Sequence, residues 1–205
     1  MKRALIAVDI QNDFCPGGTL AVPGGGDIIP VVNKLLEIIP VSVLTQDWHP
    51  VGHISFASTH GKPDYSIDDS EKNLGVLWPV HCVAGTHGAD FHPALESFRG
   101  KLILRKGSTF DLDSYSAFFE NDHCTSTGLA GWLREREIQQ VIIAGLATDY
   151  CVLYTAMDSV RLGFATTIVI DAVRGVDASP GDAERALRTM EAAGCTLILS
   201  NRIDK

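Results

Sequence analysis

Short runs of apolar and β-branched residues recur along the chain and alternate with segments of helical periodicity. The runs are almost continuously apolar, which is typical of strands buried on both faces of a parallel sheet. Bounded by turn residues, they predict six strands. These strands are expected at residues 4–10, 41–45, 101–104, 141–144, 166–170 and 196–199.

Helices are expected between these strands, at residues 27–38, 127–137, 150–162 and 182–193. In the first of them, apolar side chains recur at helical spacing, and the last is followed by Gly194, the residue preferred just beyond a helix end. The β-α-β alternation predicts an α/β fold, a doubly wound parallel sheet of about six strands flanked by helices. No repeat or linker divides the chain, so we expect a single domain over residues 1–205.

Residues 46–100 interrupt this alternation and show little periodic pattern. Six of the seven histidines and two of the three tryptophans lie in this segment. A loop of this length inside a compact domain is usually functional. We therefore expect a functional loop region at about 46–100.

The charge balance limits the partners. The chain has 17 Lys and Arg against 25 Asp and Glu, a net charge of -8. Nucleic acid and anionic membranes require a basic face, so the balance favours a small-molecule substrate. The apolar run behind the basic start is too short for a secretory signal, and no stretch approaches a membrane span, so we expect a cytosolic protein.

The five cysteines are an odd number and form no C-x-x-C pair. A disulfide framework is therefore unexpected, and each thiol is free in a reducing compartment. For Cys15, Cys124 and Cys195 we expect ordinary packing as small apolar residues.

Polar residues stand at the carboxyl ends of four predicted strands: Asp9, Asp47, Lys106 and, after a tight turn, Cys151. Ligands of open α/β sheets bind at this edge. Cys151 lies near a helix start, where backbone N–H groups and the helix dipole stabilise a thiolate and lower its pKa. Asp9, Lys106 and Cys151 would then supply a base, a stabilising cation and a nucleophile. The alternative is that Cys151 packs as an apolar residue.

A second group of polar residues suits a divalent metal ion. Asp47, His49 and His53 follow the second strand, and His81 comes later in the loop region. One carboxylate with two or three imidazoles fits Zn²⁺, or Fe²⁺ or Mn²⁺, with positions left for water or substrate. The short D-x-H spacing is common, and the remaining histidines are expected to make structural hydrogen bonds. These are His60, His87, His92 and His123.

Four motifs carry a family resemblance. They are Ala4-Leu5-Ile6-Ala7-Val8-Asp9-Ile10-Gln11-Asn12-Asp13-Phe14, Asp47-Trp48-His49-Pro50, Trp78-Pro79-Val80-His81-Cys82-Val83 and Gly145-Leu146-Ala147-Thr148-Asp149-Tyr150-Cys151. With them the chain resembles the nicotinamidases (pyrazinamidases) of the isochorismatase-like cysteine hydrolase superfamily. The first and last motifs are typical of the superfamily, and the middle two of its nicotinamidase branch.

The resemblance implies hydrolysis of nicotinamide to nicotinate and ammonia in NAD salvage, and of pyrazinamide as well. It implies a three-layer α/β/α fold and a catalytic triad of Asp9, Lys106 and Cys151. Cys151 would form a thioester, and the backbone N–H groups of Ala147 and Cys151 would hold the oxyanion. A cis peptide bond before Ala147 is a further implied feature.

The resemblance also implies one divalent metal ion, most simply zinc, held by Asp47, His49 and His81, with His53 as a candidate fourth ligand. The metal would orient the substrate ring. Phe14, Trp78 and Tyr115 match positions that wall the ring pocket, which suits a flat aromatic substrate. Core packing is an open alternative for Tyr115, and Tyr150 receives no role.

Three other functions stay open at this point. One is another hydrolase of the superfamily, such as an isochorismatase or a carbamoyl-amide hydrolase. The second is a non-catalytic α/β module that binds a metabolite. The third is a redox-sensing thiol protein, although no resolving cysteine is adjacent in the sequence. A homo-oligomer is equally open.

Overall fold

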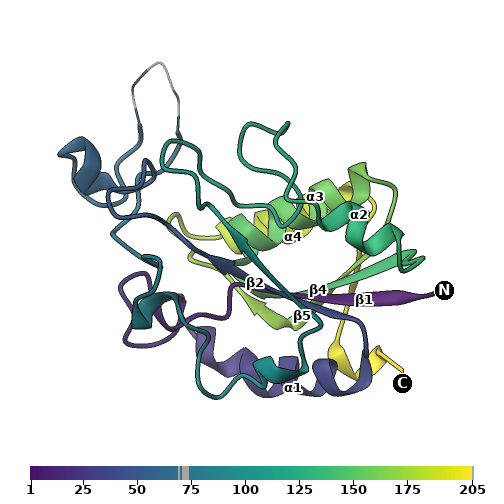
Figure 1. The fold of residues 1–205 in the computed structure, drawn as a ribbon. Helices are drawn as coiled ribbons and strands as arrows, with labels where there is room; N and C mark the ends of the chain where they lie inside the picture. The colour runs from purple at the N-terminus through teal and green to yellow at the C-terminus, as the bar shows by residue number, and fades with distance from the viewer. Residues whose placement is uncertain (69, 71–73, 205) are drawn as a thin grey trace.

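A six-stranded, all-parallel sheet forms the centre of the protein, as the apolar runs predict. The computed structural model describes residues 1–68, 70 and 74–204. The strand order is β3-β2-β1-β4-β5-β6 (Figure 1). The strands are β1 (Arg3–Val8), β2 (Ser42–Asp47), β3 (Leu102–Lys106), β4 (Gln140–Leu146), β5 (Ala165–Arg174) and β6 (Thr196–Ile198). The prediction of a doubly wound α/β fold is confirmed.

Helices cover both faces of the sheet and give three layers (Figure 1). α1 (Ile29–Ile38) lies on one face, and α2 (Leu129–Arg134), α3 (Leu153–Arg161) and α4 (Asp182–Ala192) lie on the other. Two predicted helices begin differently from the expectation. The first starts as the 3-10 turn η2 (Gly25–Ile28), and the third starts as a π-helical turn, η6 (Thr148–Val152).

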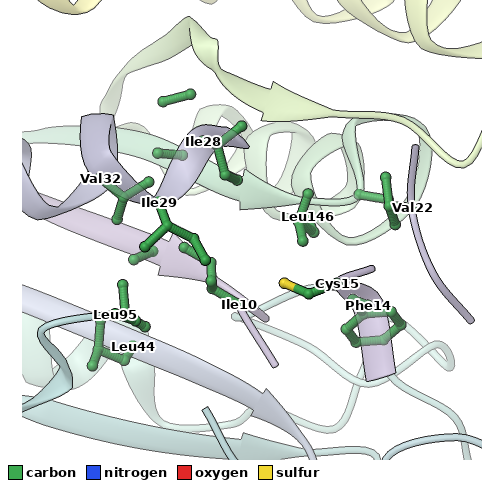
Figure 2. Close-up of a cluster of buried hydrophobic side chains, with 14 of the residues drawn as sticks. Ile10, Phe14, Cys15, Val22, Ile28, Ile29, Val32, Leu44, Leu95 and Leu146 are labelled. Carbon is green, nitrogen blue, oxygen red and sulfur yellow. The ribbon is translucent and has the colours of Figure 1, made fainter. Parts of the chain in front are cut away.

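The four central strands, β2, β1, β4 and β5, contribute alternate side chains to two separate apolar clusters, because successive side chains of a strand point to opposite faces. Leu5 and Ala7 of β1 belong to the cluster on the α1 side. Ile28 and Val32 of the same cluster are shown in Figure 2. The alternate residues of β1 belong to the cluster under α2, α3 and α4; they are Ala4, Ile6 and Val8. Burial on both faces explains why the strands read as continuous apolar runs.

The segment between β2 and β3 has little regular structure, as predicted. Among its described residues, helical structure is limited to three 3-10 turns, η3 (Ala57–His60), η4 (His87–Ala89) and η5 (Ser97–Arg99). Isolated bridges connect it to itself and to the chain after β1, including His49–Val83, Phe56–Trp78 and Gln11–Phe91. The segment is thus fastened over the carboxyl end of the sheet.

The sheet reverses its winding between β1 and β4, which are neighbours in the sheet. At such a switch point the connections after the two strands run to opposite faces and leave room for a ligand at the carboxyl ends. Asp9 follows β1 here, and η6 follows β4. Within the described residues, no helix is both long and apolar enough to cross a membrane.

Candidate active site

Asp9, Lys106 and Cys151 meet at the carboxyl edge of the sheet. The Lys106 ammonium nitrogen lies 2.9 Å from Asp9 Oδ2 and 3.4 Å from Cys151 Sγ. It also donates a hydrogen bond to the backbone carbonyl of Ser114, at 2.8 Å. Asp9 and Lys106 are fully buried, and Cys151 is buried as well. A buried cation needs such partners, because water cannot solvate it.

Asp9 is held in place by its backbone conformation and by Thr45 on the neighbouring strand. Its φ of 47° is left-handed, which turns the chain sharply at the end of β1. The Thr45 hydroxyl donates to Asp9 Oδ1 at 2.5 Å, and the Asp9 N–H donates to Thr45 Oγ1 at 3.1 Å. Thr45 therefore leaves Oδ2 directed toward Lys106. Sequence reasoning missed Thr45, because a buried threonine in a strand carries no signal of its own.

Burial raises the pKa of the Cys151 thiol well above its ordinary value, against the opposing effect of Lys106. The sequence led us to expect the reverse, a pKa lowered by the helix start. Burial and the two nearby carboxylates of Asp9 and Asp47 outweigh that effect. The pKa of Asp9 is raised by burial too, against the attraction of Lys106. A protonated thiol must lose its proton during attack, so a neighbouring base is required.

Asp47, His49 and His81 converge in a second buried group beside the first. The Nε2 atoms of His49 and His81 lie 3.6 Å and 3.9 Å from Asp47 Oδ2. The other ring nitrogens are hydrogen-bonded to backbone carbonyls, His49 Nδ1 to Gly107 at 2.9 Å and His81 Nδ1 to Pro79 at 2.8 Å. Protein metal sites use such outer bonds to orient histidine ligands. Both free Nε2 atoms therefore face the same carboxylate oxygen, which fits a metal site.

Two further observations support this fit. Burial lowers the pKa of His81 to about 4, so its imidazole is neutral and can act as a ligand near pH 7. Gly107 has a φ of 61°, and a Cβ there would lie 2.6 Å from the His49 ring. Only glycine therefore allows the carbonyl of this residue to hold His49 so closely.

His53 stands beside this group but faces elsewhere. Its ring stacks on His49, with the centroids 4.2 Å apart. Its Nδ1 lies 2.8 Å from the Ser55 hydroxyl, and its Nε2 lies 3.3 Å from the carbonyl of Leu112. His53, His49 and Asp113 can approach a common point, whereas His53 is absent from the group formed with Asp47 and His81.

The remaining histidines lie outside both groups. His60 Nε2 is 2.7 Å from the Ile54 carbonyl, and His92 Nδ1 accepts the N–H of Ala94. His87 and His123 are exposed. None of these four belongs to a potential metal-binding group among the described residues.

One narrow cavity opens onto both groups. Its wall includes the three aromatic residues expected from the sequence, Phe14, Trp78 and Tyr115, and Cys151. The Trp78 indole N–H donates to the Tyr115 hydroxyl at 3.0 Å, so these two rings are fixed against each other. The other lining residues are Leu20, Asp47, His81, Ala147, Tyr150 and Val176. The thiol and the carboxylate-histidine group thus face one aromatic-walled space.

Three of these wall residues were missed from the sequence: Leu20, Tyr150 and Val176. Leu20 and Val176 are aliphatic and come from loops whose course the pattern does not predict. Tyr150 adjoins Cys151, and its ring lies 4.7 Å from that of Trp78. It is shared with a larger outer cavity of about 650 Å³.

The turn before Cys151 has an unusual backbone. A cis peptide bond joins Leu146 to Ala147, as the resemblance implied. Ala147 lines the cavity next to Cys151 and precedes the first residue of η6.

Comparisons with known proteins agree with this geometry. The family model "Isochorismatase domain" matches residues 3–202. A nicotinamidase of Acinetobacter baylyi is 49% identical over 98% of this chain and 94% of its own. A nicotinamidase/pyrazinamidase of Mycobacterium tuberculosis is 41% identical over 97% of this chain and 100% of its own.

Solved structures of similar proteins have the same fold as this chain. A nicotinamidase/pyrazinamidase structure from Acinetobacter baumannii has a TM-score of 0.94 and 48% identity, covering 98% of this chain and 97% of its own. A pyrazinamidase of Pyrococcus horikoshii in complex with zinc has a TM-score of 0.80 and 38% identity, covering 97% and 99%. A protein from L. infantum in complex with nicotinate has a TM-score of 0.85 and 37% identity, covering 98% and 93%. The chain belongs to the isochorismatase family.

Proposed function

We propose that this protein is a nicotinamidase that hydrolyses nicotinamide to nicotinate and ammonia, and that also accepts pyrazinamide. One observation carries the proposal: Cys151 and the pair Asp47 and His81 line the same narrow, aromatic-walled cavity. The thiol is suited to attack a carboxamide carbon. A metal ion held beside Asp47 and His81 would be suited to bind a ring nitrogen of the same flat substrate. The names of the similar enzymes support this substrate.

In the first half of the reaction, Cys151 Sγ attacks the carboxamide carbon and its proton passes to the Asp9 carboxylate. The carbonyl oxygen becomes an oxyanion, which the backbone N–H groups of Ala147 and Cys151 stabilise. Lys106 balances the negative charge of the developing thiolate and of Asp9. Asp9 then gives the proton to the leaving nitrogen, the C–N bond breaks, and ammonia departs.

In the second half, water replaces ammonia and attacks the thioester carbon. Asp9 takes a proton from this water, the C–S bond breaks, and the proton returns to Cys151 Sγ. The carboxylic acid formed loses its remaining proton to water and leaves as nicotinate, and the site regains its starting protonation state. Because Asp9 acts first as base, then as acid and again as base, a pKa raised by burial suits its role.

Asp47, His49 and His81 would hold one divalent metal ion, which we propose to be zinc. When bound, the metal would supply Lewis-acid chemistry suited to orienting a substrate that carries a ring nitrogen. The zinc in the similar P. horikoshii structure supports this choice. We do not assign His53 as a fourth ligand, because both its ring nitrogens have hydrogen-bond partners; it lies beside the site.

An ammonia-release assay tests the proposal. Wild type, Cys151→Ala and metal-depleted enzyme are compared with nicotinamide as substrate. Cys124→Ala is the matched control, because Cys124 is exposed and not packed as the sequence led us to expect, unlike the buried Cys15 and Cys195. We expect turnover in wild type and Cys124→Ala and none in Cys151→Ala. If wild type hydrolysed only a different amide, the protein would belong with another hydrolase branch of the family.

A further inference from the structure

Asp149 is a buried carboxylate that the proposed mechanism does not use. It lies two residues before Cys151 on η6 and is only 8% exposed. Its Oδ1 accepts the backbone N–H of Val176 at 3.0 Å, and its Oδ2 accepts that of Asp177 at 2.8 Å. Both donors belong to the loop between β5 and α4. Asp149 therefore fastens this loop to the turn that carries the thiol.

The loop fits tightly against these partners. A Cβ on Gly175 would lie 2.5 Å from the Cβ of Ala183 and 3.3 Å from Asp149 Oδ1, so the close approach requires glycine. On the other side, Asp177 Oδ1 accepts the N–H of Ala183 at 2.9 Å. The loop is thereby held between η6 and the first turn of α4, with little freedom to shift.

Val176 brings this loop to the substrate cavity. Its side chain lines the cavity together with Cys151 and Ala147, and it packs against the apolar cluster that contains Phe14. The backbone N–H of this wall residue is the one held by Asp149 Oδ1. A shift of the loop relative to η6 would therefore move a wall of the pocket relative to the thiol.

We propose that Asp149 is a positioning residue that holds Val176 as a wall of the ring pocket, and that together they limit the size of ring carboxamide accepted. The inference rests on the proposed function, because it assumes that a ring carboxamide occupies this cavity. An ionised carboxylate suits the task, since both its oxygens accept and neither donates. Asparagine would turn an NH₂ group toward one of the two backbone N–H groups.

The test compares kcat and KM for nicotinamide and for quinoline-3-carboxamide, a larger fused-ring amide. The variants are Val176→Ala and Asp149→Asn. Asp171→Asn, on β5, is the matched control, because the Asp171 carboxylate also accepts two hydrogen bonds. They come from the backbone N–H of Ser200 at 2.8 Å and from its hydroxyl at 2.6 Å. Asp171 and Ser200 are not among the cavity-lining residues.

We expect Val176→Ala to raise the kcat/KM ratio of the larger over the smaller amide by about tenfold or more. Asp149→Asn should shift the ratio in the same direction and raise KM for nicotinamide much more than it changes kcat. The double variant should shift the ratio no further than the larger single effect, because both changes act on one wall. Asp171→Asn should keep the wild-type ratio.

An unchanged ratio in Val176→Ala overturns the size limit. A lower kcat in Asp149→Asn with unchanged KM and ratio overturns the positioning role, because Asp149 would then act on the Cys151 turn. If Asp149→Asn does not fold, Gly175→Ala replaces it, because the added Cβ would crowd Asp149 Oδ1 and Ala183 and displace the loop. This variant must raise the kcat/KM ratio of the larger over the smaller amide. Failure of wild type on nicotinamide would defeat the proposed function itself, whereas wild-type turnover with unmoved ratios defeats this inference alone.

Discussion

Lys106 and Asp47 form a buried ion pair that joins the two groups of the candidate active site. Lys106 Nζ contacts Asp47 Oδ1, while Oδ2 of the same carboxylate faces His49 and His81. Lys106 also contacts Asp9 and Cys151. The thiol and the candidate metal site are thus linked through two side chains, and a change at either group should affect both.

Replacing Lys106 with methionine should destabilise the fold as well as abolish activity. The change leaves Asp9 and Asp47 buried without their cation, and breaking such a pair costs about 3–5 kcal/mol. Denaturant unfolding measures this loss, with Lys101→Met as the control because Lys101 is exposed next to the same strand. An unfolding free energy of Lys106→Met equal to that of the control would show that the pair does not hold the site together.

Replacing His81 with alanine should reduce metal binding. His81 Nε2 faces Asp47 Oδ2, and the loss of one of the three proposed ligands should lower metal affinity at least about tenfold. Elemental analysis after dialysis against a fixed zinc concentration gives the bound stoichiometry, and His87→Ala provides an exposed-histidine control. Equal zinc content in the two variants would contradict the assignment of His81.

The dependence of kcat/KM on pH should show an acid limb set by Asp9. Asp9 must be ionised to accept the thiol proton, so activity is lost as the pH falls through its pKa. Burial raises that pKa above the ordinary value of 3.8. The limb should therefore lie at higher pH than an exposed aspartate would give. A limb at or below the ordinary value would argue against Asp9 as the base.

Replacing Thr45 with valine should move this acid limb further toward neutral pH. The Thr45 hydroxyl donates to the Asp9 carboxylate and favours its ionised form, so removing it raises the pKa of Asp9. A hydrogen bond to a charged group is worth about 1.5–3 kcal/mol, so kcat/KM should fall roughly tenfold or more. Thr59→Val removes a hydroxyl bonded to the His53 carbonyl and serves as the control. A limb at the same pH in both variants would exclude Thr45 from this role.

Much of the fold was predictable because the four central strands are buried on both faces, which makes each of them an almost continuous apolar run. The grouping of Asp9, Asp47 and Lys106 was also predictable. Each stands at the carboxyl end of a strand, and the carboxyl ends of parallel strands lie at one edge of the sheet. The raised pKa of Cys151 was not predictable in this way. It depends on the burial of Cys151, which a residue's position at a helix start does not reveal.

Other parts of the site depend on contacts between loops. Val176 lines the cavity from the loop after β5, which is hydrogen-bonded to Asp149 and passes close to it at Gly175. Neither the apolar pattern nor the spacing of polar residues encodes that contact. The π-helical turn at Thr148–Val152 was also missed, because its side chains fit an ordinary helix pattern equally well.

Trapping the thioester tests most directly whether Cys151 is the nucleophile. Wild-type enzyme and Cys151→Ala are mixed with nicotinamide, quenched in acid within a turnover and analysed by intact-protein and peptide mass spectrometry. We expect a nicotinoyl adduct on the peptide that contains Cys151 in wild type and no adduct in the variant. An adduct on another residue, or steady ammonia release by Cys151→Ala, would contradict it.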